Sequence, residues 1–209
     1  SAASLYFSQG NAVETTEKEY FIVVSIPEKP TLFEGVYQDV LTPEACDMLI
    51  KLYTKDIFPK ELPIIGTGAG AVDRDIRNVE RVMLPTYKDI GGRLAAVGLS
   101  ANHDAWNFNI THANQAEFLI YPAGGRYQAH VDTFLSPSEE CRKLTVLAFL
   151  NDDFKGGKFF IQDGQNKHYP PQTKGTILVF PSFIMHGVED VEEGQRCSVV
   201  CWMVGPFFK

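Results

Sequence analysis

The strongest constraint on the fold is a series of short apolar segments that recurs from Trp106 to the end of the chain. Turn-forming sequences such as PAGG, NDDFKGG, QDGQN and VEEGQ separate these segments. Many short strands joined by glycine-rich turns are typical of an antiparallel sandwich or barrel. We therefore expect a mainly β, α+β fold built on a jelly roll (double-stranded β-helix). The expected strands are WNFNI, AEFLIY, RYQAHVD, KLTVLAFL, GKFFI, GTILVF and RCSVVCWMV.

The N-terminal part of the chain differs, because it predicts supporting helices. After an apolar strand-like run at residues 20–26, Thr42 is placed to cap a helix that has Pro43 at its first position. Its buried stripe is expected to contain Ala45, Leu49 and Leu52. The segment YKDIGGRLAAVG predicts a second helix that ends near Gly98.

The domain organisation follows from length and composition. A chain of 209 residues with 44% apolar and 22% charged residues is long enough for one domain with a sizeable core. The opening SAASLYFSQG resembles the remnant of a protease-cleavable tag, so residues 1–14 are set apart as a tag remnant or disordered N-terminus. Residues 15–209 form the expected single domain, with the jelly-roll core at about 104–205.

Charge and cysteine content narrow the partners and the compartment. The formal net charge of −7 disfavours nucleic acid as a partner, since such proteins usually carry a basic surface. The four cysteines form neither a CxxC pair nor a dense framework, so we expect buried, reduced thiols. The sequence contains no membrane-length apolar run and no visible signal peptide, so the expected location is intracellular, in the cytoplasm.

A candidate metal site begins at His130 and Asp132. Side chains two residues apart on a strand point to the same face, so these two are expected to aim together. The ordinary alternative is an exposed polar strand face. His186, which lies 56 residues after His130, supplies a third ligand in the segment FPSFIMHGVED. Two histidines and one carboxylate leave three positions open on an octahedral metal, as in non-haem Fe(II) oxygenases.

A candidate anion site lies further along the chain. Arg196, Ser198, Val200 and Trp202 alternate and therefore share one strand face. A guanidinium beside a hydroxyl suits a carboxylate, which takes two hydrogen bonds from the arginine and a further one from the serine. The sequence therefore offers a metal site and a carboxylate site on the same β-rich domain.

With these residues in place, the chain resembles the Fe(II)/2-oxoglutarate-dependent dioxygenase superfamily, in its prolyl 4-hydroxylase-like branch. FLIYPAGGRYQAHVDTF resembles the strand and turn that lead into the metal-binding histidine and aspartate. LTVLAFLNDDFKGGKFFI and PQTKGTILVFPSFIMHGVEDVEEGQRCSVVCWMV resemble the family's later strands. The resemblance covers residues 115–205 and, more loosely, the segment QDVLTPEACDMLIKL.

The resemblance implies roles for particular residues. It implies iron ligands at His130, Asp132 and His186, with Arg196 on the distal (C5) carboxylate of 2-oxoglutarate. Phe149 stands where certain relatives place a tyrosine that helps to hold that carboxylate. Ser198 or Thr145 is the candidate to supply that hydrogen bond instead, and the resemblance adds Tyr121 as a co-substrate candidate. The substrate-pocket candidates are Tyr127, Trp202, Arg77 and Arg74.

Several of these residues also have simpler interpretations. Tyr121 and Tyr127 fit a role as packed aromatics, and Trp202 fits a structural role. Arg74 and Arg77 end the glycine-rich segment 64–78, which is either a solvated charge run or a lid over the substrate.

The implied activity is hydroxylation of a peptidyl proline with release of succinate and CO2. The implied cofactors are Fe(II), 2-oxoglutarate and O2, with ascorbate as a reductant. The expected partner is a proline-containing peptide or protein; no membrane partner is expected, and the oligomeric state stays open. One alternative is oxidation of another amino-acid side chain or of a free amino acid. A different class of function is a non-catalytic β-sandwich that binds a ligand or partner.

Overall fold

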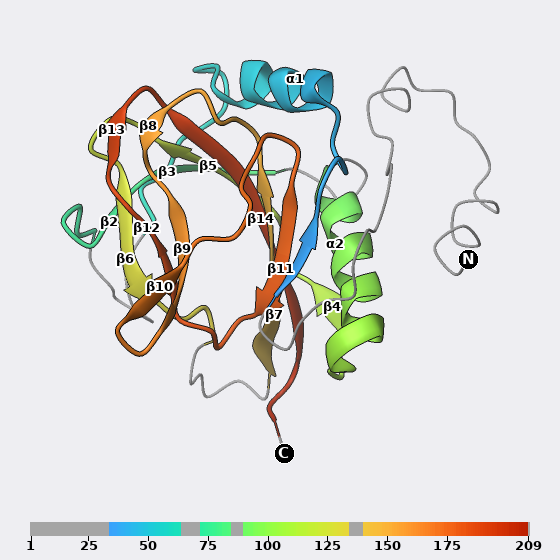
Figure 1. Cartoon of the computed structure of the whole chain (residues 1–209). Coiled ribbons are helices and arrows are strands. Elements are labelled where there is room, and N and C mark those ends of the chain that lie inside the picture. Colours follow the sequence, from blue (N-terminus) through green and yellow to red (C-terminus); the bar gives the residue numbers. More distant parts are fainter. Residues whose placement is uncertain (1–33, 64–71, 85–89, 134–139, 209) are drawn as a thin grey trace, which may run out of the picture.

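The computed structural model describes residues 34–63, 72–84, 90–133 and 140–208. Two β-sheets face each other in this part of the chain, and helices α1 and α2 lie on the outer side of the larger sheet (Figure 1). The expected mainly β fold with N-terminal helices is therefore confirmed. The strand expected at residues 20–26 lies outside the described residues.

The larger sheet has the order β1-β11-β7-β14-β5-β3, with β4 paired to β14, and its described neighbouring strands are antiparallel. Its longest strands, β7 and β14, lie at the centre and are buried along most of their length. Their side chains alternate between the face covered by the helices and the face towards the smaller sheet. The strands are β1 (Gly35–Tyr37), β3 (Glu80–Met83), β4 (His112–Ala113), β5 (Glu117–Tyr121), β7 (Glu140–Phe149), β11 (Ile177–Pro181) and β14 (Arg196–Pro206).

The smaller sheet has the order β10-β9-β12-β6-β2 and faces the larger one (Figure 1). A separate two-stranded ribbon pairs β8 with β13. The strands are β2 (Arg77–Asn78), β6 (Arg126–His130), β8 (Lys155–Gly156), β9 (Phe159–Asp163), β10 (Asn166–His168), β12 (His186–Val188) and β13 (Val191–Glu193).

Helix α1 (Pro43–Tyr53) begins as its sequence predicts. The Thr42 side chain accepts a hydrogen bond from the Ala45 amide at 3.2 Å, and Pro43 opens the first turn. The expected buried stripe is only partly right, because Leu52 is 37% exposed. The helix buries one face against the sheet through Ala45, Cys46, Leu49 and Tyr53, and Leu52 lies outside that face.

Helix α2 (Ile90–Ala101) continues beyond the predicted end at Gly98. Gly98 is buried against the larger sheet, where an added Cβ would lie 2.8 Å from Val146 Cγ2 and 3.1 Å from Met203. This glycine therefore permits close helix–sheet packing and does not end the helix.

The strand predicted at WNFNI is also wrong. Residues Asn102–Trp106 form a π-helical turn that extends α2, and Asn107 adopts a left-handed conformation with φ of 51°. The Asn102 side chain accepts from the Phe108 amide and donates to the Phe108 carbonyl, which holds the chain in this path. Alternating Trp106, Phe108 and Ile110 pack on the core without entering a strand.

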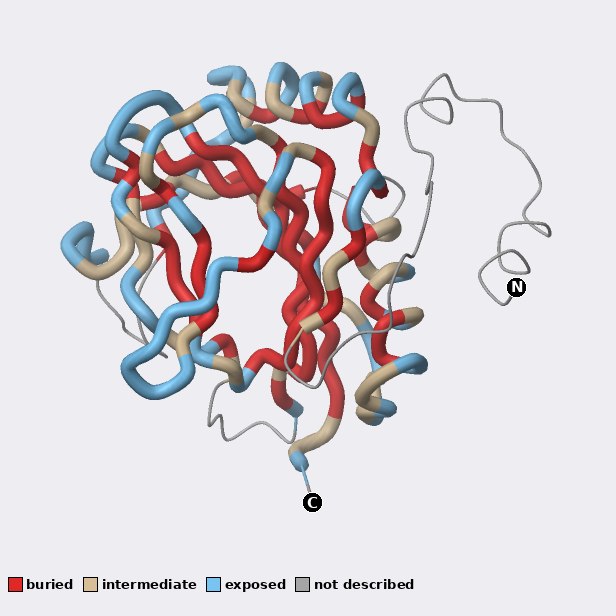
Figure 2. Tube along the Cα trace, in the orientation of Figure 1, coloured by how far each residue is buried: buried red, intermediate tan, exposed pale blue. Residues whose placement is uncertain are grey.

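The core has two layers, one on each face of the larger sheet. One layer joins the sheet to the helices through residues such as Leu94, Phe118 and Val146. The other fills the space between the two sheets with residues such as Leu119, Phe180 and Trp202. Figure 2 shows the central strands of the larger sheet buried along most of their length and many of the turns exposed. Among the described residues, no helix is long and apolar enough to cross a membrane.

Candidate active site

The pairing of β6 with β12 brings the two predicted histidine ligands together. His130 and His186 are directly opposite each other in the register of these antiparallel strands. Their ring centroids lie 4.3 Å apart. The two histidines are 56 residues apart in the sequence, and one cross-strand pair brings them together on the inner face of the smaller sheet.

Asp132 lies just beyond the end of β6 and completes the cluster. Its amide donates to the Ser182 carbonyl at 2.8 Å, which fixes the backbone after the strand ends. One carboxylate oxygen lies 3.5 Å from His130 Nε2 and the other lies 3.4 Å from His186 Nε2. The three side chains therefore converge, as the sequence predicts.

Both imidazoles are oriented by backbone carbonyls. Nδ1 of His130 contacts the Gln128 carbonyl at 2.8 Å, and Nδ1 of His186 contacts the Ile184 carbonyl at 2.9 Å. A protonated Nδ1 that donates to a carbonyl leaves Nε2 as the metal-binding nitrogen. In both histidines this Nε2 faces Asp132.

Protonation in the cluster also suits a metal. Burial is the main cause that lowers the pKa of His130, which favours the neutral imidazole. Burial alone raises the pKa of Asp132, but His186 and His130 outweigh it and hold that pKa well below its usual value. A neutral imidazole and an ionised carboxylate are the forms that bind metal.

The donor set fits a divalent metal. One ligand atom from each of His130, Asp132 and His186 lies within 4.8 Å of the others. Two imidazole nitrogens and one carboxylate oxygen on one side leave the opposite side open for further ligands, as in the facial triad of non-haem Fe(II) oxygenases.

Thr145 and Trp202 hold the carboxylate of Asp132. The Thr145 hydroxyl and Trp202 Nε1 each donate to Asp132 Oδ2 at 2.8 Å, and Thr145 also contacts the Ser182 hydroxyl at 3.0 Å. The Thr145 hydroxyl, which we predicted to contact the co-substrate, is directed to the metal-ligand candidate Asp132, and its contact with the co-substrate stays a prediction. Trp202, which we placed in the substrate pocket, orients the same carboxylate.

Replacing Trp202 with phenylalanine is expected to weaken metal binding by about 10- to 100-fold, because a hydrogen-bonded partner of a metal ligand is lost. Phenylalanine keeps an aromatic ring beneath Arg142, whose guanidinium lies 3.6 Å from the Trp202 ring centroid. Calorimetric titration with Mn(II) measures the effect. Trp106→Phe, at the other tryptophan of the chain, is the matched control. Equal metal affinity in both variants would show that the indole nitrogen does not support the site.

A β-bulge brings Tyr127 to the metal cluster. Strict alternation from His130 would place Tyr127 on the outer face, but the register of β6 and β12 shifts between these two positions. The Tyr127 ring consequently stacks on His130 with 3.5 Å between centroids. The Arg77 guanidinium lies 4.5 Å from the Tyr127 ring centroid. Of the residues predicted for the substrate pocket, Tyr127 thus lies next to a metal-ligand candidate, and Arg77 lies against the Tyr127 ring.

Arg196 is a buried charge on the inner face of β14. It is 1% exposed, and its guanidinium carbon lies 5.0 Å from the ring centroid of Tyr121 and 5.5 Å from that of Phe149. Nη1 donates to Ser198 Oγ at 3.1 Å. Nε and Nη2 have no hydrogen-bond partner among the described residues. A carboxylate that enters between the sheets would satisfy both nitrogens.

The other residues predicted for the site are exposed or lie outside the described residues. Arg74 is exposed in the turn before β2. Residues 64–71 of the proposed lid lie outside the described residues. His103, His112 and His168 are exposed and lie apart from the cluster in sequence. All four cysteines are buried and free, which agrees with the expected reduced thiols.

Three charged residues on the inner face of the larger sheet were not singled out from the sequence: Arg81, Glu117 and Arg142. Glu117 begins the otherwise apolar strand β5, and Arg142 lies in the N-terminal, charged part of β7. A charge within a buried strand was the available signal, since such residues are rarely buried without a partner or a function.

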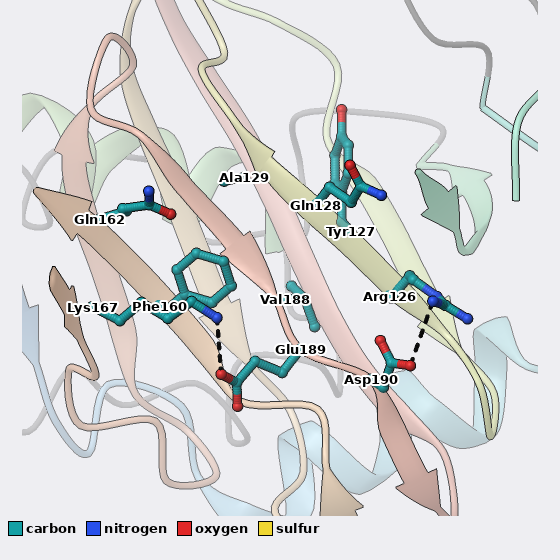
Figure 3. A pocket seen from close by; sticks show the side chains of 10 residues that line it. All are labelled: Arg126, Tyr127, Gln128, Ala129, Phe160, Gln162, Lys167, Val188, Glu189 and Asp190. Atoms are coloured by element: carbon teal, nitrogen blue, oxygen red, sulfur yellow. Dashed lines mark hydrogen bonds and ion pairs between the residues drawn. The ribbon is translucent and has the colours of Figure 1, made fainter. Parts of the chain in front are cut away.

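A separate depression of about 500 Å³ lies on the outer face of the smaller sheet (Figure 3). Two ion pairs, Lys167–Glu189 and Arg126–Asp190, lie among its lining side chains, and Lys167 Nζ lies 4.0 Å from the ring centroid of Phe160. None of the three metal-ligand candidates lines it. Its lining residues are Arg126, Tyr127, Gln128, Ala129, Phe160, Gln162, Lys167, Val188, Glu189 and Asp190.

Comparison with known proteins agrees with this geometry. Residues 116–204 match the sequence model of the family described as the 2OG-Fe(II) oxygenase superfamily. Members of this superfamily use Fe(II), 2-oxoglutarate and O2. The matched range contains all three metal-ligand candidates and Arg196.

Similar sequences include hydroxylases of the PKHD type. One from Psychrobacter sp. is 31% identical over 93 residues, which cover 41% of this chain and 36% of that protein. One from Thermosynechococcus vestitus is 32% identical over 91 residues, which cover 41% of each chain. The similarity therefore spans about two fifths of these relatives.

Solved structures share the fold over more of the chain. A Trichoplax adhaerens prolyl hydroxylase, in complex with a hypoxia inducible factor peptide fragment, has a TM-score of 0.65 at 20% identity, over 83% of this chain and 84% of that one. A Pseudomonas putida prolyl-4-hydroxylase has a TM-score of 0.61 at 18% identity, over 83% and 92%. Over residues 116–204 the chain therefore matches the 2OG-Fe(II) oxygenase superfamily, and its fold is that of the solved prolyl hydroxylases.

Proposed function

We propose that this protein is an Fe(II)- and 2-oxoglutarate-dependent dioxygenase that hydroxylates a peptidyl proline at the 4-position. The observation that carries the proposal is the buried Arg196. Two of its nitrogens lack partners among the described residues, and it shares the space between the sheets with the His–Asp–His cluster. A metal-chelating dicarboxylate fits both features, because one end can bind the metal while the other meets the guanidinium.

The residues have separate tasks in this reaction. His130, Asp132 and His186 would hold the metal, and Arg196 with Ser198 would bind the distal carboxylate of 2-oxoglutarate. Tyr121 lies beneath the Arg196 guanidinium and closes that end against water. When bound, the metal would couple the oxidative decarboxylation of 2-oxoglutarate by O2, with release of succinate and CO2, to hydroxylation of a C–H bond by the second oxygen atom. The protein positions the target carbon and excludes solvent.

A peptide substrate is supported by the mouth of the site and by the relatives. Tyr127 with Arg77, and Trp202 with Arg142, place an aromatic ring and a guanidinium beside His130 and Asp132 respectively. Flat rings suit a pyrrolidine, and guanidinium groups suit peptide carbonyls. The Trichoplax relative is described in complex with a peptide.

Incubation with Fe(II), 2-oxoglutarate, ascorbate and a panel of proline-rich peptides tests the proposal. Mass spectrometry is expected to show the gain of one oxygen on proline, with equimolar succinate. Comparison of hydrolysed product with authentic 4-hydroxyproline fixes the position. Oxidation only of free amino acids or of another side chain would replace the substrate assignment. A protein that binds metal but forms no succinate with any substrate would be a binding module.

A further inference from the structure

Glu117 lies on the inner face of the larger sheet, close to the metal cluster. It pairs with Val200 of β14, just as Tyr121 of the same strand pairs with Arg196. Directly paired residues share a face, so Glu117 faces the same space as Arg196. Trp202, which holds Asp132, is the next residue along that face of β14 after Val200.

Of the two carboxylate oxygens of Glu117, only Oε1 has a hydrogen-bond partner among the described residues. Arg81 Nη1 lies 3.1 Å from Glu117 Oε1, while Arg81 Nη2 lies 3.0 Å from Glu61 Oε2. One guanidinium therefore serves two carboxylates, and the trio keeps one net negative charge. Glu117 Oε2 is buried and has no hydrogen-bond partner among the described residues.

A buried carboxylate oxygen without a donor is unfavourable, so such an oxygen calls for an explanation. Arg196 shows the same combination, a buried charge with unpartnered polar atoms on the same side of the sheet. Glu117 is 5% exposed, while Glu61, the other carboxylate on Arg81, has a side chain that is 51% exposed. Of the two carboxylates that pair with Arg81, Glu117 is therefore the one placed to meet a ligand between the sheets.

Glu117 lies within electrostatic reach of Arg142, whose guanidinium lies 3.6 Å from the ring centroid of Trp202. Burial lowers the pKa of Arg142, and the carboxylates of Asp132 and Glu117 act in the opposite direction. A substrate at the open side of the metal thus meets a guanidinium, suited to carbonyl oxygens, and a carboxylate, suited to a positively charged N–H group.

We propose that Glu117 is a specificity-determining residue that binds a protonated amine of the substrate, adjacent to the residue that is hydroxylated. The amine is either a lysine side chain or a free N-terminus, which present the same ammonium chemistry. Oε2 accepts the hydrogen bond, while Oε1 stays on Arg81. The inference rests on the proposed function, because it names the substrate class of that same site.

Four proline peptides of equal length test it. Three of them are N-acetylated and differ in the residue next to proline, which is lysine, norleucine or glutamate. The fourth has norleucine at that position and a free N-terminus beside proline. Their binding is measured by calorimetry under nitrogen, with full-length protein loaded with Mn(II) and 2-oxoglutarate. We expect the lysine peptide or the free-amine peptide to bind about 10- to 100-fold more tightly than acetylated norleucine, the range of a hydrogen bond to a charged group. The glutamate peptide is expected to bind most weakly.

Two variants locate the effect. Glu117→Gln keeps the shape and an acceptor for Arg81, and it is expected to remove the difference between the amine-bearing and norleucine peptides. Glu61→Gln is the matched control, because it takes the other carboxylate from the same Arg81 at the surface. It is expected to keep the wild-type preference. Circular dichroism and 2-oxoglutarate binding confirm that both variants are folded.

The outcomes separate this inference from the proposed function. Equal wild-type binding of amine-bearing and norleucine peptides would overturn it, even if proline were hydroxylated. Loss of affinity for all four peptides in Glu117→Gln, or loss of preference in Glu61→Gln, would assign Glu117 a structural role only. Amine preference without oxidation of any proline would support the inference and reject the proposed substrate.

Discussion

Replacing Asp132 with alanine is expected to abolish succinate formation and to lower metal affinity by more than about 100-fold. Loss of a residue that merely supports a ligand costs about 10- to 100-fold, and loss of the ligand itself should cost more. The substitution also removes the acceptor shared by Thr145 and Trp202. Calorimetry with Mn(II) and detection of succinate are the two measurements.

Two further variants make this result specific. Asp132→Asn keeps the volume and one oxygen, so it should retain the fold while the negative charge is lost. Asp104→Ala removes another Asp–His contact, the exposed pair with His103 at 3.0 Å, and should leave metal binding unchanged. Succinate formation at the wild-type rate in Asp132→Ala would show that the cluster is not the metal centre.

The fold was predictable where an apolar run bounded by turn residues became a buried strand. β5, β7, β11 and β14 combine apolar residues with turn signals at both ends, and all four were expected from the sequence. The start of α1 was also predictable, since Thr42 and Pro43 act locally. The errors at Gly98 and at WNFNI arose because tertiary contacts decide those positions: Gly98 packs against Val146, and Asn102 caps Phe108.

The grouping of the three metal-ligand candidates was predictable from the sequence, whereas the contacts of the residues around them were less so. His130, Asp132 and His186 combine residue type with order along the chain, so they could be grouped without coordinates. The hydrogen bond from Thr145 to Asp132 and the bulge that turns Tyr127 inward depend on strand register. A shift of one residue moves a side chain to the other face, and the sequence does not state where such a shift occurs.

Replacing Arg196 with methionine is expected to move two quantities in opposite directions. Without ligand, the variant should be as stable as the wild type or more stable, by up to about 4 kcal/mol, because an apolar side chain replaces a buried charge. Arg196 lies between the Tyr121 and Phe149 rings, surroundings that suit methionine. Affinity for 2-oxoglutarate should fall by about 100-fold or more, since two charge-assisted hydrogen bonds are lost.

Thermal or urea unfolding with and without 2-oxoglutarate, at fixed Mn(II), separates the two effects. At 100 times its dissociation constant, the ligand should stabilise the wild type by about 2.7 kcal/mol, and it should give the variant little at the same concentration. Arg126→Met is the control, because it removes a half-exposed guanidinium that pairs with Asp190 at 3.5 Å. A surface pair of this kind contributes at most about 1 kcal/mol, and the response to 2-oxoglutarate should remain. If Arg196→Met instead lost stability without ligand and kept its affinity for 2-oxoglutarate, the buried guanidinium would be a structural group, and the co-substrate would have to bind elsewhere.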